Sequence, residues 1–321
     1  MDHVRVEEEM RAIIERHGPW TAHNIHLGDG LYTMGDRLDG EEARLQSILQ
    51  IVRDVAHHPL HELRIVDLAC LEGMYGIELA RQGARVVAIE GREANLAKAR
   101  LVREALGLEN LELHLDDVRN LSEKKYGRFD VVLCVGILYH LNVPDVFAFL
   151  ESVAEVCDQF AIFHTHVSMR PRVRASHRGR DYWGFSFMEY LPSTTAEQKR
   201  SALWSSLDNS ESFWFTRSSL FNALEAVGFT SVYECRVPLA LGWGADHVTL
   251  LAIKGERALT VSSPRINAAP VRSWPERLPA RVFPGQKWYY RPAKRLSAML
   301  PARVTDFLAK LLGIPSGRII K

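Results

Sequence analysis

The 321-residue sequence has few cysteines, and their positions exclude two kinds of covalent support. The four cysteines (Cys70, Cys134, Cys157 and Cys235) lie far apart, without a CxxC pair or a Cys/His cluster at zinc-finger spacing. Neither a disulfide framework nor a structural zinc site is indicated, so we expect a reducing, cytoplasmic environment. Since the sequence also lacks a signal-peptide pattern and an uninterrupted apolar run of about 18 residues, we expect no transmembrane segment.

Acidic residues are scarce in the C-terminal part of the chain. Residues 255–321 contain 13 Lys or Arg but 3 Asp or Glu, although the whole chain has a net charge of +1. The same part holds eight of the 14 prolines, which interrupt helices and strands. We therefore predict a domain boundary near residue 254 and a basic, proline-rich extension after it. Contact of this extension with an anionic membrane, with the rest of the chain or with a second subunit stays open.

Short apolar, β-branched runs alternate with amphipathic stretches from residue 63 onward. This pattern is typical of an α/β fold with a doubly wound, mainly parallel sheet that is covered on both faces. A late helix and two late strands add an antiparallel edge, which gives seven strands. The predicted strands are residues 64–68, 85–89, 111–115, 129–135, 160–164, 231–236 and 247–253. The predicted helices are residues 4–17, 41–56, 74–82, 92–106, 143–156 and 218–227.

An acidic residue lies at the end of each of the first three predicted strands of the sheet. Asp67 ends the first strand, Glu90 follows the second, and Asp117 follows the third. Because ligands of doubly wound sheets bind at the carboxyl ends of the strands, these carboxylates are expected to line one pocket. Asp67 would repel a pyrophosphate and attract an ammonium group, Glu90 can accept hydrogen bonds from a ribose diol, and Asp117 can accept one from the adenine amino group. The pattern predicts S-adenosylmethionine and not a dinucleotide, although each acid alone also fits a helix cap.

The first loop and the fourth strand resemble those of class I S-adenosylmethionine-dependent methyltransferases. The loop reads DLACLEG over residues 67–73 where the family motif is DxGxGxG, and the fourth strand continues as FDVVLCVGILYHL over residues 129–141. The resemblance covers residues 63–254 and implies a Rossmann-like methyltransferase fold. We expect that a tighter, more apolar loop without two of the glycines still binds the cofactor. The implied cofactor-binding residues are Asp67, Ala69, Leu71, Gly73, Glu90, Gly91, Asp117, Val118 and Val135.

Three stretches are similar to the tRNA wobble-uridine 5-oxyacetate carboxymethyltransferase family: HGPW at 17–20, GILYHL at 136–141 and SFWFTRSSL at 212–220. That family uses a carboxylated cofactor, and the resemblance places its carboxylate-binding lysine, tyrosine and arginine at His17, Tyr139 and His247. Because neutral imidazoles hold a carboxylate less firmly than permanent cations, we predict ordinary methyl transfer. tRNA modification remains an alternative, with arginines between residues 172 and 180 and the basic extension as candidate phosphate contacts.

Histidines that follow the fourth and fifth predicted strands are candidate general bases. His140 follows the fourth strand, and His164 and His166 follow the fifth, where alternate residues of an extended chain point to the same side. A histidine that titrates near neutral pH can accept the proton of a reacting hydroxyl group. Tyr139 is a further catalytic candidate. We expect no metal ion at these residues. For His140, a role as a packed or capping residue of the fold is the alternative to its role as a base. For His164 and His166 the alternative is a metal site together with Glu189.

An insertion at about residues 168–216 is rich in aromatic residues and arginine. Aromatic faces with polar edges suit a sugar or a planar ring, so we predict a lid over the acceptor; the same rings also suit the core of a small subdomain. The predicted organisation is a helical cap (1–60), a methyltransferase domain (61–254) and the extension (255–321). The predicted function is O-methylation of a small-molecule or glycan acceptor. A non-catalytic binding protein with a degenerate cofactor site remains an alternative.

Overall fold

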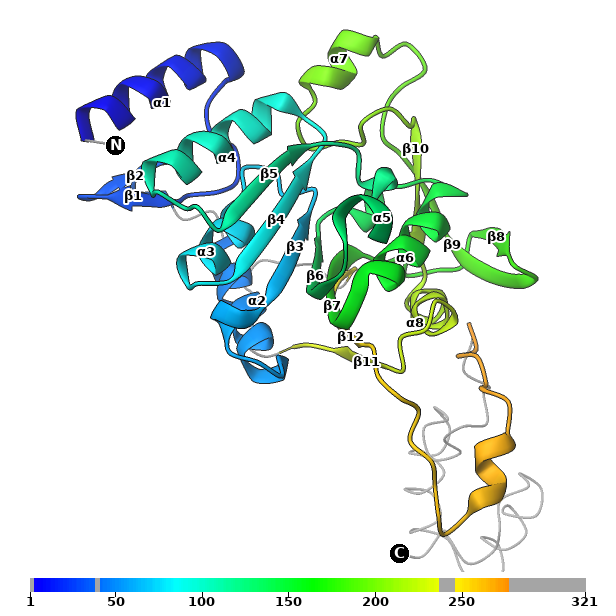
Figure 1. Cartoon of the computed structure of the whole chain (residues 1–321). Helices are drawn as coiled ribbons and strands as arrows, with labels where there is room; N and C mark the ends of the chain where they lie inside the picture. The colour runs from blue at the N-terminus through cyan, green and yellow to red at the C-terminus, as the bar shows by residue number, and fades with distance from the viewer. Residues whose placement is uncertain (1–2, 38–40, 237–245, 277–321) are drawn as a thin grey trace, which may run out of the picture. The chain divides into compact units, whose positions relative to one another are not determined.

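Seven strands form the central sheet of the protein in a computed structural model that describes residues 3–37, 41–236 and 246–276 (Figure 1). Their order is β11-β12-β7-β6-β3-β4-β5. The five strands from β7 to β5 are parallel, β12 is antiparallel to β7, and β11 is antiparallel to β12. This arrangement confirms the predicted doubly wound sheet with an antiparallel edge. The strands are β3 (Arg64–Leu68), β4 (Arg85–Glu90), β5 (Leu111–Leu115), β6 (Phe129–Val135), β7 (Cys157–His166), β11 (Ser231–Glu234) and β12 (His247–Ile253).

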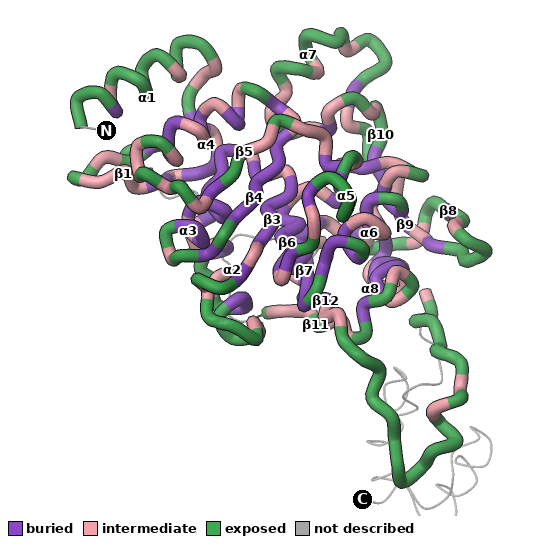
Figure 2. The backbone as a smooth tube through the Cα atoms, viewed as in Figure 1, coloured by how far each residue is buried: buried purple, intermediate pink, exposed green. Residues whose placement is uncertain are grey.

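Helices cover both faces of this sheet and bury two apolar cores against it (Figure 2). Neighbouring residues of β3 belong to different cores, because Ile65 packs on one face and Val66 on the other. Burial on both faces explains the largely apolar sequences of the central strands β3 and β6. One core includes residues of α1 (His3–His17), α2 (Glu41–Val55), α3 (Met74–Arg81) and α4 (Glu93–Ala105), and the other includes residues of α5 (Glu123–Tyr126), α6 (Asp145–Val156) and α8 (Arg217–Ala226).

Some element ends agree with the prediction and others differ from it. Helix α1 ends as predicted before Gly18, whose φ of 78° is in the left-handed region and whose N–H donates to Ile14 O at 2.9 Å. Strand β7 is longer than predicted, since its first residue, Cys157, pairs with Phe129 of β6. Helix α6 begins at Asp145 and not at residue 143, with Pro144 as its N-cap residue.

A second, three-stranded antiparallel sheet within the insertion was not predicted from the sequence. Its strands are β8 (Val173–His177), β9 (Arg180–Met188) and β10 (Glu211–Phe215), in the order β10-β9-β8. Tyr182 and Phe215 of this sheet are buried in the same core as Phe147 of α6. Trp204 and Phe187 are partly exposed, so the aromatic residues of the insertion divide between core and surface. The remaining elements are β1 (His26–Gly28), β2 (Leu31–Tyr32), α7 (Ala196–Ser201) and the 3-10 helices η1 (Leu60–Glu62), η2 (Val118–Asn120), η3 (Leu138–His140) and η4 (Pro264–Ala268).

The last strand, β12, ends one residue before the predicted boundary at residue 254. Within residues 254–276 the regular structure is the short η4, and Glu276 accepts hydrogen bonds from Thr216 and Ser219 near the start of α8. Residues 3–37, 41–236 and 246–276 contain no helix with the length and apolar character needed to cross a membrane. The predicted membrane or subunit contacts of residues 277–321 lie outside the described residues.

Candidate active site

The loop after β3 places three alternate residues in the left-handed backbone region. Ala69, Leu71 and Gly73 have φ values of 53°, 52° and 89°. These are the glycine positions of the DxGxGxG motif, so the loop keeps a glycine-like backbone although two glycines are replaced. Each replacement costs roughly 1 kcal/mol of conformational energy, because a Cβ in this region crowds the next carbonyl oxygen. The hydrogen bond from Cys70 N to Ile89 O, at 3.0 Å, helps to hold this conformation.

A buried ion pair that the sequence analysis missed fastens this loop to the N-terminal segment. Glu72 Oε1 lies 3.0 Å from Lys98 Nζ, and both side chains are fully buried. The Glu72 carboxylate also accepts hydrogen bonds from backbone N–H groups of residues 21–23, and Lys98 Nζ donates to Pro19 O at 2.6 Å. Burial alone would raise the pKa of Glu72, but His23 and Lys98 together hold it below its ordinary value. Segment 19–23 is therefore held against the first loop.

Asp67 is buried at the end of β3, as the cofactor prediction requires. Its Oδ2 accepts a hydrogen bond from Gly76 N at 3.0 Å, and the residue is 1% exposed. Burial raises the pKa of Asp67 to about 7; the Gly76 hydrogen bond opposes this shift, and the nearby Glu90 carboxylate adds to it. A cation placed beside Asp67 would stabilise the ionised carboxylate. The ammonium group of a methionine moiety has the charge that this position favours.

Glu90 and Asp117 end the neighbouring strands and are both engaged in local hydrogen bonds. Glu90 accepts from Leu71 N at 3.0 Å and from Arg92 N at 2.9 Å, and burial raises its pKa. Asp117 caps η2 by accepting from Arg119 N at 2.9 Å, and it forms an ion pair with the Arg119 guanidinium group. The cap that the sequence analysis left open is therefore present at Asp117. Its role toward adenine stays a prediction.

The predicted cofactor-binding residues converge on one pocket at the carboxyl ends of the parallel strands, with Gly73 as the exception. A Cβ on Gly73 would lie 3.0 Å from Ile77 Cδ1 and 3.1 Å from Ala99 Cβ, so this glycine is needed for the close approach of the turn to α3 and α4. Tyr139 and His140 line the same pocket, whereas His164 and His166 do not. The predicted cofactor-binding residues in the wall are Asp67, Ala69, Leu71, Glu90, Gly91, Asp117, Val118 and Val135.

His140 has the hydrogen-bond partner that a general base needs. Its Nδ1 lies 2.8 Å from Glu189 Oε1, and the Glu189 side chain is 2% exposed. The other Glu189 oxygen accepts from Ser206 N at 3.2 Å, which fixes the carboxylate. A carboxylate at one ring nitrogen orients the imidazole and leaves the other nitrogen for proton transfer. Glu189 therefore pairs with His140 and is not part of the metal set with His164 and His166 that the sequence suggested.

His164 is less suited to proton transfer than the sequence analysis expected. Its Nδ1 lies 2.9 Å from Thr249 Oγ1, and the residue is 4% exposed. Burial, aided by the positive charge of Arg44, lowers the pKa of His164 to about 2, so its imidazole stays neutral at physiological pH. His166 packs against Trp214 with ring centroids 4.4 Å apart, and its Nδ1 lies 2.8 Å from Asp246 Oδ2.

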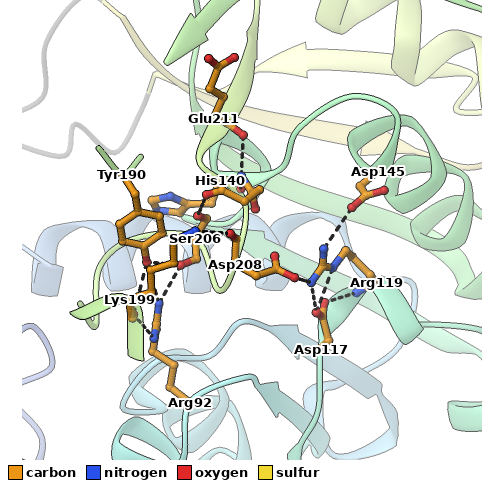
Figure 3. Close-up of polar contacts among 11 residues, drawn as sticks. Arg92, Asp117, Arg119, His140, Asp145, Tyr190, Lys199, Ser206, Asp208 and Glu211 are labelled. Carbon is orange, nitrogen blue, oxygen red and sulfur yellow. Dashed lines mark hydrogen bonds and ion pairs between the residues drawn. The ribbon is translucent and has the colours of Figure 1, made fainter. Parts of the chain in front are cut away.

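Two arginines fasten segment 189–211 to the loops that carry the predicted cofactor acids (Figure 3). Arg92 lies two residues after Glu90, and its guanidinium group donates to the carbonyl oxygens of Lys199, Arg200, Ser205 and Ser206. Arg119 joins Asp117 to Asp208, at 2.6 Å and 2.8 Å. Residues 203–209 line the pocket, and a Cβ on Gly91 would lie 2.6 Å from Leu207 Cδ1. The segment is therefore packed directly against the predicted ribose-binding turn.

Residues 65–159 match a family described as a methyltransferase domain. The chain therefore contains a methyltransferase domain. The N-terminal domain of EvdMO1, solved in the presence of SAH and D-fucose, is similar in fold: it has 26% identity and a TM-score of 0.61, and the match covers 79% of this chain and 98% of that one. A second structure of that domain with SAH bound has a TM-score of 0.60. SAH is S-adenosylmethionine without its transferable methyl group, which agrees with the predicted cofactor.

Curated relatives match a smaller part of the chain. The ubiquinone biosynthesis O-methyltransferase of Acinetobacter baumannii (strain AYE) is 28% identical over 114 residues, which are 34% of this chain and 46% of that protein. The enzyme of the same name from Nitrosococcus oceani is 35% identical over 111 residues, 35% of this chain and 43% of that protein. The chain thus spans less than half the length of these relatives. The resemblance to the tRNA wobble-uridine family stays a prediction.

Several residues of the site were not predicted from the sequence. Arg92 and Arg119 each lie two residues after a predicted cofactor acid, and this regular spacing is a signal that could have identified them. Glu72 lies inside the recognised loop, but its partner Lys98 reads as an ordinary helix-surface lysine. Glu189 was considered only for the alternative metal set with His164 and His166, because the fold of the insertion decides which histidine it contacts.

Proposed function

We propose that this chain transfers the methyl group of S-adenosylmethionine to a hydroxyl group of a small-molecule or glycan acceptor. The observation that carries the proposal is the His140–Glu189 pair in the wall of the pocket that also contains Asp67 and Glu90. A methyltransferase whose acceptor is a hydroxyl group needs a group that accepts its proton. The pair supplies that group beside the residues that we expect to bind the cofactor.

The residues present fit the cofactor. Asp67 would bind the ammonium group of the methionine moiety, since its buried carboxylate gains from a nearby positive charge. Glu90 would bind the ribose hydroxyl groups and Asp117 the adenine amino group. The left-handed turn at Ala69 and Leu71 brings backbone close to this space, and both residues line it with apolar atoms. When bound, S-adenosylmethionine supplies an electrophilic methyl group on a sulfonium leaving group.

His140 acts as the general base in this proposal. With Nδ1 held by Glu189, Nε2 accepts the proton of the acceptor hydroxyl group, and the buried carboxylate stabilises the resulting imidazolium. Tyr139 contacts the His140 ring at a centroid distance of 4.3 Å. Burial raises the pKa of Tyr139 to about 12, so its hydroxyl group stays protonated and can donate a hydrogen bond to the acceptor.

We also propose that segment 189–211 is a lid that excludes water from the reacting groups. It contributes Leu203 to Asn209 to the pocket wall, including the partly exposed Trp204. An aromatic face beside polar groups suits a sugar or a planar ring. The presence of D-fucose in the EvdMO1 crystals and the names of the curated relatives are consistent with acceptors of these two kinds.

The test is methyl transfer from isotopically labelled S-adenosylmethionine to a panel of sugars, nucleotide-linked sugars and phenols. We expect His140→Asn to lower kcat about 10²- to 10⁴-fold, the usual contribution of a general base, with cofactor affinity nearly unchanged. Glu189→Gln should lower kcat less and shift its pH profile, because it changes the partner of the imidazole and not the base itself. Unchanged kcat in His140→Asn on an accepted substrate would exclude this mechanism.

A further inference from the structure

Three side chains with metal-ligating atoms converge where β7 ends and β12 begins. His166 is the last residue of β7, His247 is the first residue of β12, and the two are paired across the antiparallel ladder. Asp246 directly precedes β12. One ligand atom from each residue lies within 4.8 Å of the others. His166 Nδ1 is 2.8 Å from Asp246 Oδ2, and His247 Nδ1 is 3.4 Å from Asp246 Oδ1.

The surrounding structure fixes these side chains before any ion binds. Val167 N donates a hydrogen bond to Asp246 O at 2.6 Å, which ties the two strand ends together next to the cluster. The His166 ring stacks on Trp214 at an interplanar angle of 16° and contacts the His247 ring at a centroid distance of 3.7 Å. All three residues are only partly buried. The site is therefore both preorganised and open to an ion from solvent.

We propose that His166, Asp246 and His247 bind one divalent transition-metal ion. Two imidazole nitrogens and one carboxylate oxygen suit Zn²⁺, Mn²⁺, Fe²⁺, Co²⁺ or Ni²⁺, whereas Mg²⁺ and Ca²⁺ are bound mainly by oxygen atoms. Three protein ligands leave at least one coordination position for water or for an oxygen of a bound molecule. Among the residues that the structure describes, no other His, Cys, Asp and Glu side chains gather in such a group.

The charges near the cluster permit a cation. The Asp246 carboxylate contributes a negative charge, and both imidazoles are neutral when they act as ligands. Arg44 exerts a positive field on His247, but its guanidinium group is paired with Glu41 at 2.9 Å, which offsets the repulsion of an ion.

The cluster adjoins the pocket wall at Tyr139. The His166 ring lies 4.6 Å from the ring of Tyr139, which lines the pocket. An ion bound here would be separated from the pocket by one aromatic ring. Metal binding itself does not depend on methyl transfer, so it is measured without an acceptor.

The experiment is a titration of the full chain, stripped with EDTA, with Co²⁺. We expect one ion per chain, with d–d absorption bands of a nitrogen- and oxygen-ligated ion and quenching of tryptophan fluorescence, since Trp214 stacks on His166. His166→Ala and His247→Ala should each weaken binding at least tenfold. Trp214→Phe should remove most of the quenching and keep the absorption bands.

Two further variants make the result decisive. Asp246→Asn changes the most exposed of the three ligands with little change in volume. It therefore tests the site even if a histidine variant does not fold. Circular dichroism shows whether each variant is folded. As a control, His61→Ala removes an exposed histidine that is not one of the three proposed ligands, and it should leave binding unchanged. Less than one ion per chain in the wild type, or wild-type affinity in Asp246→Asn and a folded histidine variant, would overturn the proposal.

Discussion

The unusual protonation of Asp67 predicts how cofactor affinity depends on pH. Only the ionised carboxylate attracts the ammonium group of S-adenosylmethionine, and burial raises the pKa of Asp67 to about 7 in the protein without cofactor. With that pKa, about three-quarters of the Asp67 carboxyls are ionised at pH 7.5, about 9% at pH 6 and about 1% at pH 5. The apparent Kd should therefore rise about eightfold between pH 7.5 and 6, and about tenfold more by pH 5.

Isothermal titration calorimetry at pH 5.0, 6.0, 7.0 and 7.5 measures this dependence. Repeating the pH 6 titration in buffers of different ionisation enthalpy should show the release of nearly one proton per bound cofactor. Glu90 titrates in the same direction, because burial raises its pKa too, so Asp67→Asn is needed as the matched control. That variant should bind more weakly at pH 7.5 and lose most of the pH dependence. A flat profile in the wild type, or an equally steep one in Asp67→Asn, would show that ionisation of Asp67 does not control cofactor affinity.

Three further predictions concern the framework of the site. Glu72→Gln should lower the free energy of unfolding by about 3–5 kcal/mol in urea titrations, because it leaves a buried Lys98 charge unpaired. Adding Lys98→Met should recover part of this loss. Additive losses in the double variant would show that the two side chains do not stabilise the fold as a pair. Ala69→Gly should raise stability by about 0.5–1 kcal/mol as left-handed strain is relieved, whereas the same change at exposed Ala148 in α6 should lower it by about 1 kcal/mol. Arg92→Gln should speed tryptic cleavage within segment 189–211 and weaken cofactor binding, and an unchanged cleavage rate would show that Arg92 does not hold this segment.

Much of the central sheet follows from local sequence patterns. Strands β3, β5, β6 and β12 have the predicted bounds. Most residues of β3 and β6 are buried, and burial on both faces of a sheet favours the apolar runs from which these strands were predicted. The edge strand β5 alternates apolar and polar residues, which is the other strand pattern. The carboxylates Asp67 and Glu90 were also found from position alone, since the topology of the sheet brings the ends of these strands together.

Contacts between distant segments could not be predicted in the same way. Strand β10 pairs antiparallel with β9 in the second sheet, with Glu211 opposite Met188. The local sequence of either segment does not indicate which segment it pairs with. Lys98 has the spacing and charge of a surface helix residue, and its burial is explained by contacts with the distant Glu72 and Pro19. His247 was aligned with a carboxylate-binding arginine, whereas the structure places it against His166, because β12 returns antiparallel to β7.

We expect the pocket formed by Asp67, Glu90 and the left-handed loop to bind S-adenosylmethionine. The most direct test of this expectation is equilibrium titration of the chain with this cofactor at pH 7.5. We predict one cofactor molecule per chain, competition by SAH, and affinity lowered at least about tenfold in both Asp67→Ala and Glu90→Ala. No saturable binding, or wild-type affinity in both variants, would show that this pocket is not the cofactor site.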